Sequence, residues 1–194
     1  MDIRVKQVAA YVFAALLLGC ASSATTETPY NRGVAAYKVK NYKEAVSNWS
    51  TAAESGNVDA MNNLAFLLFN GLGTEAQPEK AIELWRVAAS QGQSESQWHL
   101  GNAYADGTGV EKSLTTAYAW YRCSIESAER HSRESTDTTE NQIADDARKS
   151  LVGITDKLSG NELEQGNQLA TQYIEKYAPV AQPSLPANQP STGG

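Results

Sequence analysis

The sequence predicts an all-α protein built as a solenoid of stacked helical hairpins. The main observation is a pattern that occurs twice within residues 60 to 125, at a constant spacing of 36 positions. The matched pairs are Leu64/Leu100, Leu68/Tyr104, Gly71/Gly107, Gly73/Gly109, Ala81/Ala117 and Trp85/Tyr121. A period between ~20 and ~50 residues is typical of stacked units, each of which buries its apolar face only against a neighbour.

The order of features within each copy predicts a helical hairpin. An apolar helix face comes first, then a glycine pair, then a second apolar helix face. The glycines lie where the first helix must end, and glycine readily adopts the positive φ that such an ending needs. A shorter copy lies upstream, with Ala45, Trp49, Ala52, Ala53 and Gly56 placed 36 positions before Ala81, Trp85, Ala88, Ala89 and Gly92.

The repeats predict hairpins over residues 30–57, 58–93 and 94–128. In the second hairpin, Asp59 is expected to cap the first helix, since a carboxylate accepts bonds from free amides of the first turn. The second helix of that hairpin is expected to begin at Pro78, where the missing N–H has no bond to lose. Ser113 is the analogous cap in the third hairpin.

The region after the third hairpin predicts two more helices. Residues 129–140 are rich in charge, Ser and Thr, and form either a helix extension or a polar loop. Apolar residues then recur every three or four positions over residues 141–158, and Ser159 with Glu162 forms a capping box for a following helix. The faces of these two helices are expected to meet as a pair over 141–178 that caps the stack. Residues 179–194, rich in Pro, Gln, Ser and Gly, predict a disordered tail.

The repeats resemble Sel1-like repeats, relatives of the tetratricopeptide repeat with an insertion between their two helices. The third unit carries the pattern Leu100-Gly101-x-x-Tyr104-x-x-Gly107-x-Gly109-Val110, followed by Ala117-x-x-Trp120-Tyr121. The second unit is similar, but it has Ala65 and Leu68 where the family usually has Gly and Tyr. The first unit lacks the glycine-rich insertion and is closer to an ordinary tetratricopeptide unit.

The resemblance implies a right-handed α-solenoid that acts as a non-catalytic scaffold, without a cofactor, and holds a protein or peptide partner. Two alternatives stay open. Some relatives are described as cysteine-rich proteins that bind or hydrolyse β-lactams, which suggests a binder or hydrolase of cell-wall or β-lactam ligands, although this sequence lacks their cysteine pairs. The other alternative is an assembly factor for an outer-membrane complex, such as a secretion or polysaccharide-export machine.

The amino terminus has the pattern of a secretory signal over residues 1–19. Arg4 and Lys6 precede an apolar run over residues 8–18, which is well short of the ~18 residues needed to span a bilayer. The run ends at Leu17-Leu18-Gly19-Cys20, which resembles the bacterial lipobox. The alternative is an ordinary signal peptide in which Cys20 is incidental.

The lipobox resemblance implies cleavage before Cys20 and acylation of this residue, for example with palmitate. Two or more acyl chains anchor a protein stably, because each buried CH₂ contributes ~0.8 kcal/mol. Residues 20–29 would then form the lipidated cysteine and a flexible tether. Because Ala21 rather than Asp follows the anchor, the resemblance also implies sorting to the outer membrane, facing the periplasm.

Composition disfavours other classes of partner and site. The 194-residue chain has a formal charge of -6, which disfavours nucleic acid. His99 and His131 have no Cys, His or carboxylate at metal-ligand spacing, so no metal site is predicted. Cys123 takes the position of Val87 in the preceding repeat and is expected to be a small buried hydrophobe.

The predicted partner-binding groove lies on the first helix of each unit, which lines the concave surface of such a solenoid. Side chains about 100° around the helix from the packing positions Gly33, Ala65 and Gly101 should face this groove. These side chains are Tyr30, Val34, Tyr37 and Lys38, then Asn62, Phe66, Phe69 and Asn70, and finally Trp98, Asn102 and Asp106. Aromatic rings and amides suit an extended peptide or a partner helix, since rings offer area and amides pair with backbone groups. Phe66 and Phe69 have the alternative of a place in the core between repeats, and Phe69 is the stronger candidate for exposure.

Overall fold

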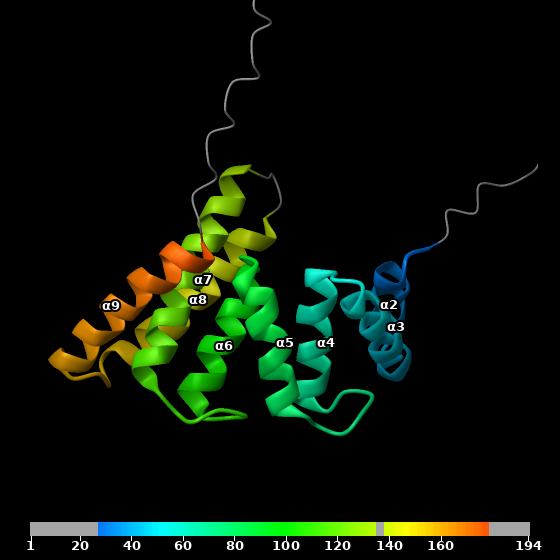
Figure 1. Cartoon of the computed structure of the whole chain (residues 1–194), viewed down its shortest axis with the longest axis horizontal. Coiled ribbons are helices and arrows are strands. Elements are labelled where there is room, and N and C mark those ends of the chain that lie inside the picture. The colour runs from blue at the N-terminus through cyan, green and yellow to red at the C-terminus, as the bar shows by residue number, and fades with distance from the viewer. Residues whose placement is uncertain (1–26, 135–137, 179–194) are drawn as a thin grey trace, which may run out of the picture.

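The computed structural model describes residues 27–134 and 138–178, and every regular element within these residues is an α-helix (Figure 1). The helices are α2 (Pro29–Lys38), α3 (Tyr42–Glu54), α4 (Val58–Asn70), α5 (Pro78–Ser90), α6 (Ser94–Asp106), α7 (Leu114–Glu134), α8 (Thr139–Thr155) and α9 (Gly160–Tyr177). None of these helices is both long and apolar enough to cross a bilayer. The predicted signal segment 1–19, the lipidation site Cys20 and the predicted tail 179–194 lie outside the described residues.

The helices pack as consecutive pairs, and the pairs lie side by side (Figure 1). The pairs are α2 with α3, α4 with α5, and α6 with α7, and neighbouring pairs meet through contacts of α3 with α4 and of α5 with α6. The second helix of each pair buries one large aromatic at the same repeat position: Trp49, Trp85 and Tyr121 are 2 or 3% exposed. The predicted solenoid of helical hairpins is confirmed.

Glycine allows close helix packing within the first and third hairpins. A Cβ atom at Gly33 would overlap the indole of Trp49, and one at Gly101 would overlap the ring of Tyr121. Because neither ring has room to shift in a packed core, a side chain at either glycine would force the helices of the pair apart.

The two glycine pairs end helices and join neighbouring hairpins. Gly71 and Gly107 end α4 and α6 in the left-handed conformation, with φ of 65° and 78°. The second glycine of each pair also has a positive φ and lies against the preceding hairpin, Gly73 against Tyr42 and Gly109 against Pro78. At Gly109 a Cβ would come within 2.9 Å of the Pro78 carbonyl carbon. Each glycine-rich loop therefore packs on the start of the second helix of the preceding unit.

Most of the predicted helix starts are confirmed. Pro78 opens α5, the Oγ of Ser113 accepts the amide of Thr116 at 3.1 Å, and Ser159 forms the capping box that opens α9. The prediction that Asp59 caps α4 is wrong, because Asn57 accepts the amide of Ala60 at 2.7 Å. Asp59 instead lies within the first turn of α4, where a negative charge favours the helix dipole.

The last helices differ from the predicted pair. α7 extends as a helix to Glu134, so this part of the polar region is a helix extension rather than a loop. The predicted helix over 141–158 begins earlier and ends at Thr155. α8 and α9 both pack extensively on α7, and their contacts with each other are few, so the prediction that their faces meet is wrong. α8 also contacts α6, and α9 also contacts α5. The two helices together therefore cover α7 from two directions.

Candidate functional site

A pocket of about 440 Å³ lies between the first helices of the first two hairpins. Its volume falls in the range of ~300–1,000 Å³ that is typical of ligand sites. The lining residues are Tyr30, Val34, Tyr37 and Lys38 of α2, Trp49 of α3, Asn62, Asn63 and Phe66 of α4, and Glu95 of α6. The pocket thus lies on the face where the groove is predicted, and aromatic rings supply much of its wall.

Many of the predicted groove residues line this pocket. Tyr30, Val34 and Tyr37 share one face of α2, since residues spaced by three or four positions lie one above the other on a helix. Asn62 and Phe66 share the facing side of α4 for the same reason. The structure therefore brings the predicted residues of the first two units together in one hollow.

Trp49, Asn63 and Glu95 line the pocket but are absent from the prediction. Glu95 lies three residues before Trp98 on α6, so extending the predicted groove face by one helical turn would have found it. Trp49 belongs to α3, the second helix of its hairpin, whereas the prediction considers only the first helix of each unit. It reaches the pocket because Gly33 has no side chain to separate the indole from α2.

The floor of the pocket is a hydrogen-bonded cluster that joins α4 to α6. Asn62 is only 2% exposed, and its Nδ2 donates to Glu95 Oε2 at 2.8 Å. Its Oδ1 accepts a hydrogen bond from Ser96 Oγ at 2.9 Å. Since a buried amide is costly without partners, these bonds stabilise Asn62 and hold the Glu95 carboxyl group at the floor.

Acidic groups surround one end of the pocket. Burial raises the pKa of Glu95, the hydrogen bond from Asn62 opposes this shift, and the nearby carboxylates of Glu140 and Asp59 raise the pKa further. Burial and then the charge of Asp59 also raise the pKa of Tyr30. Lys38 lies on α2 eight residues after Tyr30, about 12 Å along the helix axis. The pocket therefore has a negative end near Tyr30 and a positive end near Lys38.

Phe69 and Asn70 do not line the pocket. The ring of Phe69 lies 5.1 Å from that of Trp85 and packs against the core. The prediction that Phe69 is the stronger candidate for exposure is wrong, because the helix phase turns Phe69 toward α5, whereas Phe66, which also packs against the core, lines the pocket. Asn70 is exposed and donates to the carbonyl of Phe66, within its own helix, at 2.8 Å.

The predicted groove residues of the third unit lie outside the pocket. Trp98 packs beside Leu151 and Ile154 of α8, and its Nε1 donates to Ser150 Oγ at 3.1 Å. Asn102 accepts a hydrogen bond from the hydroxyl of Tyr121 at 2.8 Å, and Asp106 is exposed at the end of α6. Trp98 therefore packs against α8 and is only partly exposed, so it faces a helix rather than an open groove.

His99 lies between the pocket and the core. Its ring stacks on Trp85, with ring centroids 4.6 Å apart, and lies 5.9 Å from the ring of Phe66. Burial lowers the pKa of His99 to about 4. The imidazole is therefore neutral near pH 7 and packs as an aromatic ring, in keeping with its position against Phe66 and Trp85.

Cys123 is buried as predicted, although Val87 at the same repeat position is exposed. It is fully buried, its Sγ donates to the carbonyl of Tyr173 at 3.5 Å, and burial raises its pKa to about 12. A thiol in this state is a poor nucleophile. Within the described ranges no group of three or more His, Cys, Asp or Glu side chains has an arrangement that would hold a metal ion.

Curated relatives match the repeat region. The chain is 32% identical over 107 residues to the exopolysaccharide production negative regulator of Rhizobium leguminosarum bv. viciae, and 36% identical over 80 residues to DAP3-binding cell death enhancer 1 of Rattus norvegicus. The first match covers 55% of this chain and 40% of the relative, and the second covers 41% and 15%. A third relative is human protein sel-1 homolog 2, with 35% identity over 86 residues, or 44% of this chain and 12% of that protein. The chain thus spans less than half the length of each of these relatives.

Solved structures match more of the chain. A protective antigen of uropathogenic Escherichia coli with an SLR fold aligns with a TM-score of 0.67 and 28% identity, over 83% of this chain and 34% of that one. A Sel1 repeat protein from Oxalobacter formigenes aligns with a TM-score of 0.52 and 26% identity, over 73% of this chain and 54% of that one. The family model of the Sel1 repeat matches residues 30–57, 58–93 and 94–128, about half of the chain. The chain therefore belongs to the Sel1 repeat family.

Proposed function

We propose that this chain is a lipid-anchored scaffold of the bacterial cell envelope that holds an extended segment of a partner protein, without catalysis, in the groove between α2 and α4. The observation that supports this most directly is the pocket of about 440 Å³ lined by Tyr30, Tyr37 and Phe66 from two facing helices. Tyr37 is exposed and the other two rings are partly buried, and aromatic rings in a hollow provide contact area at small entropic cost and are frequent anchors in protein interfaces.

The family supports the same proposal. Sel1 repeat proteins are commonly protein-interaction scaffolds, and one relative is named for its binding to another protein. A solenoid presents such a surface because stacked first helices line one continuous concave face. In this chain the open part of that face lies on the first two units.

Site-specific crosslinking in intact cells tests the groove. A photoreactive phenylalanine analogue at position 37 should capture a partner protein, whereas the same analogue at Val87 on α5 should not. Val87 is the matched control because it is also a surface position, 46% exposed against 37% for Tyr37, but lies on a second helix. Equal capture at both positions, or capture at Val87 alone, would contradict the proposal.

The lipid anchor is a separate part of the proposal. It rests on the apolar run and the tetrad Leu17-Leu18-Gly19-Cys20, which together resemble a lipoprotein signal. Growth with an alkyne-labelled palmitate analogue should label the wild-type protein and not the Cys20→Ser variant, and the wild type should fractionate with the outer membrane. Labelling that persists in Cys20→Ser would rule this anchor out.

A second candidate process is the control of surface polysaccharide, with a partner in a polysaccharide-export complex. The relative from Rhizobium leguminosarum, which is named as a negative regulator of exopolysaccharide production, supports it. Deleting the gene for this chain should change the amount of surface polysaccharide, and wild-type protein should restore it. A Tyr37→Ala variant that restores it equally well would separate this process from the groove.

A further inference from the structure

We infer that the negative end of the pocket takes an arginine side chain of the partner segment. This inference rests on the proposed function and specifies which partner side chain the groove binds. It is drawn from three features of the pocket: its aromatic walls, its carboxylate floor and the lack of a cation beside that carboxylate.

The walls suit a planar cation. Tyr30 and Phe66 come from facing helices and line the same hollow as Glu95. A guanidinium group stacks favourably on aromatic faces and is weakly hydrated, so it enters a partly buried aromatic site more readily than an ammonium group.

The floor presents a carboxylate in a fixed position. Glu95 Oε2 accepts a hydrogen bond from Asn62, and Asn62 is itself fixed by Ser96, so the carboxyl group is oriented before any ligand arrives. A carboxylate held in this way suits the two parallel N–H donors of a guanidinium. Partial burial of the site strengthens such a pair relative to one in open water.

The chain supplies no cation of its own at this end. In the part of the chain that the structure describes, no Lys or Arg forms an ion pair with Glu95, Asp59 or Glu140. The contacts of Glu95 and Glu140 with charge-capable groups are with histidines, His99 at 3.9 Å and His131 at 3.6 Å. A partner that brings a positive charge therefore complements these three carboxylates.

The sequence outside the described residues contains few basic side chains. Residues 179–194 contain no Lys and no Arg, and neither do residues 135–137. Among residues 1–26 the basic side chains are Arg4 and Lys6, both within the predicted signal segment. The cation is therefore expected to come from another protein, and Lys38 at the opposite end of α2 favours a carbonyl or carboxylate of the same partner segment.

Selection from a phage-displayed library of random linear peptides on the full chain in detergent tests this inference. The recovered peptides should share an arginine at one position. In a fluorescence anisotropy titration, replacing this arginine by citrulline, which is neutral and similar in shape, should weaken binding to the wild type about tenfold.

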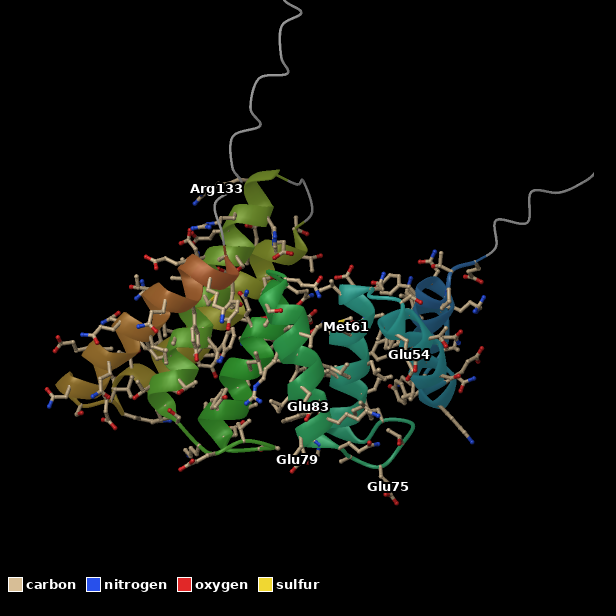
Figure 2. The ribbon with its side chains drawn as sticks, in the orientation of Figure 1. Glu54, Met61, Glu75, Glu79, Glu83 and Arg133 are labelled. Atoms are coloured by element: carbon tan, nitrogen blue, oxygen red, sulfur yellow. The ribbon has the colours of Figure 1, made fainter. Side chains whose placement is uncertain are left out.

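The variant Glu95→Gln keeps a hydrogen-bond acceptor for Asn62 and removes the charge. It should bind the arginine peptide about tenfold more weakly than the wild type and should no longer distinguish arginine from citrulline. Glu83→Gln is the matched control, since it makes the same change of net charge at an exposed position on α5, labelled in Figure 2, and should bind as the wild type does.

The outcomes separate the two proposals. If selected peptides lose affinity on Tyr37→Ala but share no basic position, or if Glu95→Gln still distinguishes arginine from citrulline, the groove stands and the arginine assignment is overturned. If no peptide depends on Tyr37, the groove proposal itself is overturned, and the arginine assignment with it.

Discussion

The second and third hairpins use the same repeat positions for different purposes. Asn62 and Phe66 on α4 correspond to Trp98 and Asn102 on α6, each pair 36 positions apart. On α4 these side chains line an open pocket, whereas on α6 Trp98 lies under α8 and Asn102 bonds to Tyr121. The difference shows that a repeat position decides which way a side chain points, while the next element in the stack decides whether a partner can reach it.

Removing the indole of Trp98 should have the largest effect on this comparison. Trp98→Ala takes away packing against α8 and the hydrogen bond to Ser150, and is expected to lower the free energy of unfolding by about 3 kcal/mol. Tyr37→Ala, at a more exposed aromatic of the open half, should lower it by less than about 1 kcal/mol. Chemical denaturation followed by circular dichroism measures both. Equal losses would mean that α8 does not cover the third unit in solution.

Gly101→Ala makes the third hairpin like the second, which has Ala65 at the same position. The new methyl group would overlap the ring of Tyr121, so the free energy of unfolding should fall by about 2 kcal/mol. Gly153→Ala is the control, because this glycine is also helical and has nothing within 4 Å of an added Cβ. Helix propensity predicts a gain of about 0.5 kcal/mol for the control. A loss in both variants would point to a general need for glycine rather than to close packing.

His99 and Asn63 also share a repeat position, and the buried histidine should make stability depend on pH. Its pKa falls from 6.5 to about 4 on folding because burial disfavours the imidazolium, even with Glu95 nearby. Below the unfolded-state pKa the unfolded chain therefore binds a proton that the folded chain does not, so stability is full above it and decreases as pH falls toward 4.

The contribution of His99 should amount to a loss of about 1.3 kcal/mol between about pH 7.5 and about pH 5.5. His99→Gln removes this titration, so the difference in unfolding free energy between wild type and variant should change by that amount across the range. Parallel pH profiles of the two proteins would show that folding does not lower the pKa of His99.

The smallest effect concerns the start of α4. Asn57→Ala should lower the free energy of unfolding by about 0.5–1 kcal/mol, because it removes the acceptor for the Ala60 amide. Asp59→Ala should lower it by only a few tenths, about 0.3 kcal/mol, since Asp59 contributes a first-turn charge rather than a cap. Thermal unfolding of the two variants measures both changes. A larger loss of unfolding free energy for Asp59→Ala than for Asn57→Ala would indicate that Asp59 is the cap.

The repeat spacing predicts the hairpins because each unit obeys local rules that can be read along the chain. The 36-residue period places Trp85 and Tyr121 in the core and Gly71 and Gly107 at helix ends. Helix phase predicts that Tyr30, Tyr37 and Phe66 lie on the faces of α2 and α4 that line the pocket. These predictions depend on neighbours in sequence or on the next repeat.

The rest depends on contacts between segments far apart in sequence. The apolar series of α8 shows that one face is buried but not that it packs on α6 and α7 in preference to α9. Cys123 and Val87 share a repeat position, yet Cys123 is 0% exposed and Val87 is 46% exposed. The carbonyl of Tyr173 on α9 lies beside the thiol and accounts for its burial. The cap of α4 is Asn57 rather than the predicted Asp59, because both residue types suit an N-cap and only the register of the helix start, here a difference of two residues, decides between them.

The position of α8 determines how the binding surface of such a protein can grow. Duplicating one unit ahead of α6 would add a further helix with an accessible face beside α4, so the protein could bind a longer peptide. The same duplication placed after α7 would separate α8 from Trp98. It would therefore expose the indole that now packs against α8, without lengthening the open binding surface beside α4. Lengthening by tandem duplication is therefore favoured at the amino-terminal side of the stack, and the carboxyl-terminal side acts as its fixed end.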